Sequence, residues 1–179
     1  MASVNTLCKS VLNVKNTVIK NCNLYSDKNG VKHIRIQARP NKWHENDCPF
    51  CHKSCPVYDK HSSRPTIWRG LDWGGILVEV EYQTHRLICP EHGVYVAEVP
   101  WAYPCSRFTK DFDLTAAWFA SYLPRSTTSY FMRVDWETVG RCVNRVLHNL
   151  EPERSRRLDG LVNIGIDEPV IKRVTSTSQ

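Results

Sequence analysis

Two short cysteine motifs constrain this chain most. "CPFC" at 48–51 and "CPEH" at 89–92 are C-x-x-C and C-x-x-H knuckles, with 37 residues between them. Two intervening residues let both ligands of a pair reach one ion, and four sulfur and nitrogen ligands in a tetrahedron suit Zn²⁺. The matched spacing predicts a structural zinc, because four protein ligands leave no open position for water. The predicted ligands of this zinc ribbon are Cys48, Cys51, Cys89 and His92.

Other potential ligands lie close to the first knuckle. His44, His52 and Cys55 could compete for the ion, and Cys55 could replace His92. The Cys-Pro start that both knuckles share favours the symmetric set. The alternative interpretation is that the cysteines are scattered structural residues. The remaining cysteines have no partner pattern and are expected to be ordinary buried or free thiols: Cys8, Cys22, Cys105 and Cys142.

The N-terminal stretch and the hydropathy of the chain bear on its location. "MASVNTLCKSVLNVK" lacks the apolar core of a secretion signal. No apolar run approaches the roughly 20 residues of a membrane helix. We therefore expect a cytoplasmic protein without a membrane partner. In that reducing compartment, 8 cysteines favour metal binding or free thiols over disulfides.

Residues 1–105 form a β-rich region, with the zinc ribbon at about 45–95. Residues 14–38 predict a hairpin, because two strand-like segments flank the turn signal Asn29-Gly30. Residues 67–73 and 76–88 alternate well enough to be strands, with Gly74-Gly75 as their turn.

From Ser106 the pattern changes to helix. Residues 106–123 place Phe108, Phe112, Ala116 and Phe119 or Ala120 on one face. Pro124 ends this helix, and a short segment follows at 125–132. Asp135 is a good N-cap for a second helix. The predicted apolar face of that helix comprises Trp136, Val139, Val143, Val146 or Leu147, and Leu150.

The order helix, short helix, turn and helix is the layout of a helix-turn-helix, which we place at 106–152. On the last helix, polar side chains face away from the predicted apolar stripe. Arg and Asn bind guanine and adenine edges, and Arg also binds phosphates. The alternative is the solvated face of an ordinary bundle helix. The candidate DNA-binding residues are Thr138, Arg141, Asn144, Arg145 and His148.

The formal net charge of +6 is unevenly spread along the chain. Residues 1–66 hold 11 Lys/Arg against 4 acids, residues 67–106 hold 2 against 5, and residues 107–160 hold 9 against 7. A basic surface favours a polyanionic partner, most often nucleic acid. Because a zinc ribbon and a helix-turn-helix are also predicted, we interpret the positive charge as a sign of binding to double-stranded DNA. The alternative is that the charge serves solubility alone.

Six stretches of the chain resemble bacterial insertion-sequence transposases of the ISL-three group. They are "CPFC", "RGLDWGG", "HRLICPEHG", "VPWAYPCSRFT", "VDWETVGRCVNR" and "LDGLVNIGIDE", which together cover about 48–168 in the family's order. The resemblance implies a zinc ribbon, a helix-turn-helix and then a DDE transposase domain of RNase H-like fold. It also implies binding to the terminal inverted repeats of an insertion element, which the family moves by cut-and-join DNA chemistry.

The resemblance also implies roles for individual residues. The four knuckle residues fall on the family's zinc positions, with His92 where many relatives have Cys. Asp167 falls on the first acid of the catalytic triad, at the end of a strand at 161–166. In the family, the triad holds two metal ions, so Mg²⁺ is expected only with a complete catalytic domain. In the linker of the 153–168 segment, the candidate phosphate-binding residues are Arg154, Arg156 and Arg157.

The end of the chain departs from the family pattern. Residues 169–179, "PVIKRVTSTSQ", contain no Asp or Glu. A one-base deletion in an encoding of the family-like "TSYKKGHKYIT" gives this sequence, so we expect a frameshifted, disordered tail. The expected fold class is α+β: an N-terminal β-rich zinc ribbon, an all-α helix-turn-helix region and one lone strand of an incomplete RNase H-like domain.

Three functional hypotheses follow. The first is a truncated transposase that binds the inverted repeats at the ends of its element and lacks the catalytic domain. The second is a subunit of an active transposase that a second reading frame completes. The third is a zinc-ribbon interaction protein without DNA affinity. We also consider a homodimer.

Overall fold

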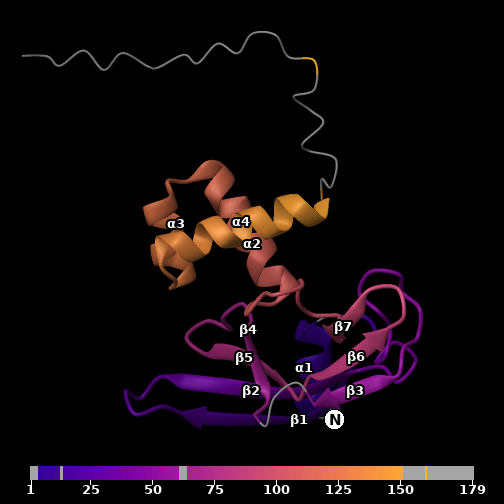
Figure 1. The fold of residues 1–179 in the computed structure, drawn as a ribbon. Coiled ribbons are helices and arrows are strands. Elements are labelled where there is room, and N and C mark those ends of the chain that lie inside the picture. Colours follow the sequence, from indigo (N-terminus) through magenta and orange to yellow (C-terminus); the bar gives the residue numbers. More distant parts are fainter. Residues whose placement is uncertain (1–3, 13, 61–63, 151–159, 161–179) are drawn as a thin grey trace, which may run out of the picture.

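The computed structural model describes residues 4–12, 14–60, 64–150 and 160. These residues form two β-sheets and four α-helices, which confirms an α+β fold. In Figure 1, helices α2, α3 and α4 lie above the larger sheet, and the smaller sheet stands to one side. The predicted strand at 161–166 and the tail at 169–179 lie outside the described residues.

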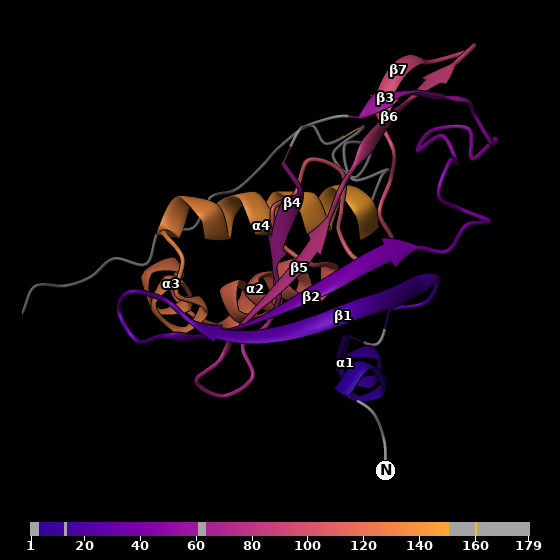
Figure 2. The same ribbon diagram turned by 90° about the horizontal axis from the view of Figure 1, so that it is seen from below.

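The larger sheet has the strand order β1-β2-β5-β4. The predicted hairpin is confirmed, with β1 (Thr17–Ser26) antiparallel to β2 (Lys32–Pro40). The Asp27 carboxylate accepts hydrogen bonds from the backbone of Asn29 at 2.8 Å and Val31 at 2.9 Å, and this fixes the turn. β5 (Leu77–Tyr82) runs parallel to β2 and antiparallel to β4 (Thr66–Arg69). Figure 2 shows β1 as the outer strand, with helix α1 (Val4–Leu12) beside it.

The smaller sheet consists of β3 (Val57–Lys60), β6 (His85–Cys89) and β7 (Gly93–Val96), in the order β3-β6-β7. The prediction of one strand over 76–88 is therefore wrong, because β5 and β6 belong to different sheets. The burial pattern shows that the predicted strand divides between β5 and β6. Even-numbered residues are buried from Val78 to Thr84, whereas the odd-numbered Leu87 and Cys89 are buried afterwards. A shift of one residue in the alternation of buried and exposed positions moves the buried side chains to the opposite face of the strand.

The predicted strand at 67–73 is shorter than expected. β4 ends at Arg69, and Trp73 forms only an isolated bridge with Ile76 across the Gly74-Gly75 turn. The backbone amide of Gly70 still donates to the Val78 carbonyl at 2.8 Å.

Trp101 anchors the core of the larger sheet. It is fully buried and packs edge-on against Trp68 and Tyr82, with ring centroids 5.6 and 5.8 Å away. Helix α1 adds Cys8 and Leu12 to the same core. A buried aromatic side chain removes about 150–250 Å² from water, so Trp101 ties the segment after β7 firmly to the sheet.

Helices α2 (Lys110–Tyr122), α3 (Arg125–Met132) and α4 (Trp136–Leu150) have a core of their own. Phe112 and Ala116 of α2 are buried, and Phe108 and Phe119 pack against them, as predicted. The predicted apolar face of α4 is wrong at both ends, because Trp136 and Leu150 are more than 60% exposed. The buried residues of α4 are Thr138, Val139, Cys142 and Val146.

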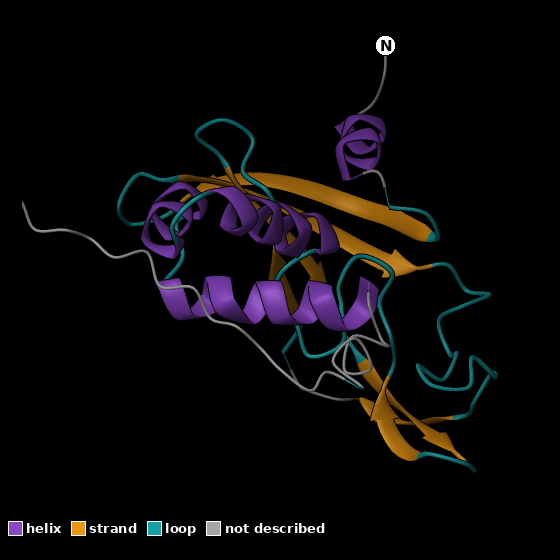
Figure 3. Cartoon of the chain, turned by 90° about the horizontal axis from the view of Figure 1, so that it is seen from above, coloured by secondary structure: helices purple, strands orange, loops and turns teal. Residues whose placement is uncertain are grey.

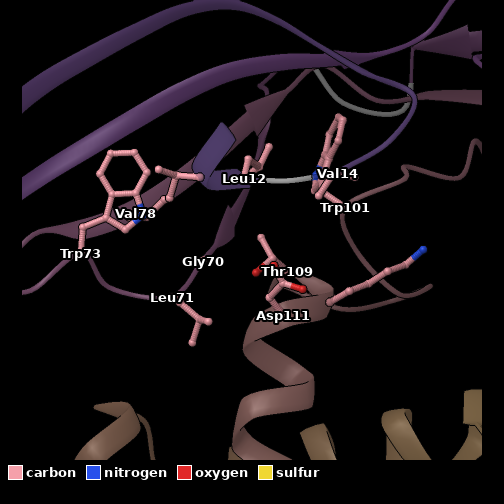
Figure 4. Close-up of a pocket in the computed structure, with 11 residues that line it drawn as sticks. Leu12, Val14, Gly70, Leu71, Trp73, Val78, Trp101, Thr109 and Asp111 are labelled. Carbon is pink, nitrogen blue, oxygen red and sulfur yellow. The ribbon is translucent and has the colours of Figure 1, made fainter. Parts of the chain in front are cut away.

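Arg69, at the end of β4, connects the larger sheet to the helices. Its backbone exchanges hydrogen bonds of 2.9 Å with Arg107 and Thr109, just before α2. Its guanidinium donates to the carbonyl of Arg133, between α3 and α4, at 2.8 Å. A cavity of about 250 Å³ lies between the sheet, α1 and the start of α2, where Trp73, Trp101 and Thr109 line it (Figure 4).

Candidate metal centre and nucleic-acid interface

The structure brings the two knuckles together. The ligand atoms of Cys48, Cys51, Cys89 and His92 all lie within 4.8 Å of one another. The Sγ atoms of Cys51 and Cys89 are 3.8 Å apart, and Nδ1 of His92 lies 3.5 Å from Cys89 Sγ and 3.8 Å from Cys48 Sγ. A tetrahedral zinc with Zn–S bonds of about 2.3 Å separates its sulfur ligands by about 3.8 Å. The cluster therefore has the dimensions of a four-coordinate metal site.

Local backbone geometry positions each pair of ligands. In the first knuckle, the amide of Cys48 donates to Lys53 O and the amide of His52 donates to Cys48 O, both at 2.9 Å. His52 has φ 55°, which turns the chain tightly. The second knuckle is the turn between β6 and β7, where Gly93 adopts φ 83°. A glycine suits this position because L side chains rarely adopt positive φ.

An aromatic contact joins the two knuckles. The Phe50 ring stacks on the His92 imidazole with centroids 5.2 Å apart, and Tyr95 packs edge-on against Phe50 at 4.7 Å. These contacts hold the imidazole plane, which sets the direction of the Nδ1 lone pair.

The electrostatics of the cluster favour a bound cation. Hydrogen bonds from the backbone amides of Cys51 and Phe50 lower the pKa of Cys48. Burial acts to raise the pKa of Cys89, but the amides of Glu91 and His92 help to lower it to about 7. The Lys53 amide acts to lower the pKa of Cys51, yet burial and the neighbouring thiols raise it. Crowded thiolates repel one another, so a cation is needed before all of them ionise.

The competing ligands take no part in the cluster. Cys55 is buried beside it, and its Sγ donates to the Lys53 carbonyl at 3.4 Å. Burial and the nearby Cys89 raise the pKa of Cys55 to about 11. His44 pairs instead with Asp47 at 2.9 Å. Of the unassigned cysteines, Cys8 and Cys142 are buried, Cys22 is partly buried and Cys105 is exposed.

Helices α3 and α4 are joined by a three-residue turn. Arg133 ends α3 in the left-handed conformation, with φ 52° and ψ 46°. Asp135 then caps α4, since its carboxylate accepts from both the amide and the hydroxyl of Thr138 at 2.7 Å. These hydrogen bonds lower the pKa of Asp135. The order of helix, short helix, turn and helix agrees with the sequence, and its assignment as a helix-turn-helix stays a prediction.

One stripe of α4 faces outward. Glu137, Arg141, Asn144 and His148 are exposed and follow one another at intervals of 4, 3 and 4 residues. That spacing keeps them on one side of an α-helix. Arg141 forms an ion pair with Glu137 of the same stripe, at 2.9 Å, and both side chains are more than half exposed. Such a surface pair contributes little to stability, so the Arg141 guanidinium can exchange Glu137 for another acceptor.

Arg145 and Thr138 are placed differently from the other candidate DNA-binding residues. Arg145 forms a two-point ion pair with Asp113 of α2, at 2.7 and 3.0 Å, and the Asp113 side chain is fully buried. Ser106 donates to the same carboxylate at 2.9 Å. Burial acts to lower the pKa of Arg145, but the ion pair raises it. Both Arg145 and Thr138 therefore point into the helical unit, which corrects their predicted outward position.

Asp113, the buried partner of Arg145, is a residue that the sequence analysis missed. It directly follows Phe112 and precedes Ala116 by three positions, so it lies on the buried side of α2. A buried carboxylate requires a cation or several donors. A carboxylate on the buried face of α2 predicts a partner inside the protein. This pattern could have indicated the pairing with α4.

Several predicted residues lie outside the described part of the chain. They are Asp167 and the linker residues Arg154, Arg156 and Arg157. Their roles stay predictions. No helix among the described residues combines the length and apolar character that crossing a membrane requires.

Comparison with known proteins finds two similar transposases. Both are the "Transposase for insertion sequence element IS1557", from Mycobacterium tuberculosis strains CDC 1551 / Oshkosh and ATCC 25618 / H37Rv. Each is 36% identical over 169 residues, which is 93% of this chain. The chain spans 38% of the length of these curated relatives. No protein-family model and no solved structure matches it.

Proposed function

We propose that this chain supplies the DNA-binding part of an insertion-sequence transposase and binds double-stranded DNA at the ends of its element. The outward stripe of α4 carries the proposal. Arg141, Asn144 and His148 occupy it, on the second helix of a helix-turn-helix. In this motif the second helix enters the major groove, which is about 12 Å wide and admits one α-helix.

The chemistry of the stripe suits base recognition. Arg141 can bind guanine O6 and N7 with two donors, and Asn144 can bind adenine N6 and N7. Their side chains lie one helical turn apart on an exposed surface, so neighbouring base pairs are within their reach. In the proposal, Arg154, Arg156 and Arg157 contact phosphates after α4 ends at Leu150.

Zn²⁺ is the metal that we assign to the cysteine cluster, defined as Cys48, Cys51, Cys89 and His92. Three thiols and one imidazole at tetrahedral spacing support zinc over the hard cations, which prefer oxygen ligands. All four positions are protein ligands, so the ion stabilises the fold and does not activate water.

The similar transposases support a role in transposition. Both are transposases for an insertion sequence element, and the shared region covers nearly the whole chain. We further propose that the chain is of the ISL-three group and that Asp167 is the first acid of an RNase H-like catalytic domain. An Mg²⁺ site there needs further acids from that domain.

Binding to duplex DNA that carries the element's ends tests the proposal. Specific binding is expected, with an affinity that falls steeply as salt rises, because phosphate contacts release counterions. Arg141→Ala should weaken specific binding by about 1–3 kcal/mol if the contact to a base is bidentate. Fluorescence anisotropy with the element-end duplex and a scrambled duplex measures both effects.

Lys53→Ala is the matched control for the loss of one positive charge. Lys53 lies by the cysteine cluster, where it pairs with Glu91, and it should have little effect on specificity. Equal binding of both duplexes by the wild-type chain would reject recognition of element ends. No binding at low salt would favour a zinc-ribbon interaction protein instead.

A further inference from the structure

Strand β7 forms an open edge of the smaller sheet. Among the strands described, β6 alone pairs with it. The amide of Ala97 donates to the His85 carbonyl, so the odd-numbered residues Gly93 and Tyr95 also direct their backbone groups toward β6. The backbone groups of Val94 and Val96 therefore point outward. Figure 2 shows β7 with β3 and β6 in the part of the molecule that extends beyond the helices, and Figure 3 shows strands extending beside the helices in the same way.

The side chains along this edge are apolar and exposed. Val94, Tyr95 and Val96 are between 38% and 42% exposed, as is Ile88 of the adjacent strand. Val94, Val96 and Ile88 share one face of the sheet, since Ile88 pairs with Val94. Tyr95 lies on the other face with Phe50, which is 56% exposed. An exposed apolar edge strand is a template for pairing with another strand.

Two other sheet edges, β3 and β1, carry the protection that β7 lacks. On β3, Asp59 forms an ion pair with Arg86, and Arg86 also lies over the Tyr58 ring at 5.3 Å. The edge strand β1 exposes Lys20, Asn21 and Asn23 and has an irregularity between Ile19 and Asn21. Charged residues and bulges are the usual means of blocking edge pairing.

We propose that β7 pairs antiparallel with β7 of a second copy of this chain, about a two-fold axis at Tyr95. In this register Val94 lies opposite Val96 of the copy, and the two residues exchange both backbone hydrogen bonds. By symmetry, Val96 exchanges the same two backbone hydrogen bonds with Val94 of the copy. The four valines then form one apolar cluster, and the two Tyr95 rings meet on the opposite face beside Phe50.

The absence of charge on this strand favours a copy over other partners. Residues 93–96 carry no charged side chain, whereas the chain as a whole has a net charge of +6. A two-fold axis gives both halves of the interface the same charge, so a neutral strand avoids like-charge repulsion. DNA would need Lys or Arg at this surface. The inference is independent of DNA binding and goes beyond the proposed function.

Sedimentation of the zinc-loaded full chain over a range of concentrations tests the pairing. We expect a reversible dimer, weak because strand pairing over four residues is smaller than a standard interface of about 1,200–2,000 Å². Val96→Lys should weaken it by about tenfold or more, since each lysine replaces an apolar contact with Val94 of the copy and the two new charges lie diagonally across the axis. Val57→Lys makes the same change on the opposite edge, at an exposed residue of β3, and should leave the dimer intact.

Crosslinking tests the register. Opposed residues of a non-hydrogen-bonded pair have Cα atoms about 4.5 Å apart, within disulfide range. Tyr95→Cys, in a Cys105→Ser background, should therefore form a disulfide-linked dimer in air, while Ile88→Cys should not. A chain that stays monomeric at every concentration, equal weakening by Val57→Lys, or equal crosslinking of both cysteine variants would overturn the proposal.

Discussion

Substituting Cys89 by serine is expected to unfold the smaller sheet and the first knuckle. Three ligands would remain, and a thiol whose pKa is lowered to about 7 would be lost. A structural zinc contributes about 10–16 kcal/mol of apparent folding free energy in small metal-dependent units. The buried residues around the cluster are few, namely Cys55, Leu87 and Ala97 besides the ligands, so apolar burial cannot replace the metal.

Metal analysis and hydrogen exchange measure this effect. The wild-type chain should contain one zinc per chain, and residues 46–60 and 85–97 should be protected from exchange. Cys89→Ser or removal of zinc by a chelator should abolish that protection. Cys105→Ser, at an exposed cysteine outside the cluster, should change neither value. Protection that persists in metal-free protein would refute a structural role for the ion.

Replacing Arg145 by alanine is the second large effect that we expect. The substitution leaves the Asp113 carboxylate fully buried without its cationic partner, while uncharged donors such as Ser106 remain. Removing one partner of a buried ion pair costs about 3–5 kcal/mol, because the other charge stays desolvated. Denaturant unfolding, followed by far-UV circular dichroism, measures the loss.

Arg141→Ala is the matched control on the same helix. Its pair with Glu137 is exposed to solvent, so stability should hardly change. Replacing both partners, as in Asp113→Leu with Arg145→Met, should recover most of the stability lost in Arg145→Ala. A loss for Arg145→Ala no larger than for Arg141→Ala would contradict the buried-pair interpretation. Loss of DNA binding in Arg145→Ala would report unfolding, not base contact.

Local chemistry made part of the structure predictable from the sequence. The knuckles have fixed ligand spacing, the Asn29-Gly30 turn defines its hairpin, and Asp135 marks the start of α4. Each of these signals acts within a few residues. The helices at 110–122 and 136–150 followed from apolar periodicity and from Pro124.

The features that the sequence analysis missed depend on distant partners. The parallel pairing of β2 with β5 joins residues more than 40 positions apart, and no local pattern specifies it. Trp136 was assigned to the core by its hydrophobicity, yet Cys142 and Thr138 occupy the buried positions. Arg145 was assigned to the surface by its charge, because its partner Asp113 lies on another helix.

The packed side and the exposed side of α4 are under different evolutionary constraints. Residues that hold the helix in place, such as Val139, Cys142 and Arg145, lie on one side, and the residues of the outward stripe are exposed. Mutations at Arg141, Asn144 and His148 are therefore nearly neutral for folding and free to accumulate. Asp113 and Arg145, by contrast, constrain each other, since changing either alone passes through an unstable intermediate. Under the proposed function, a lineage built on this helix can change its preferred DNA sequence rapidly while it retains an unchanged scaffold.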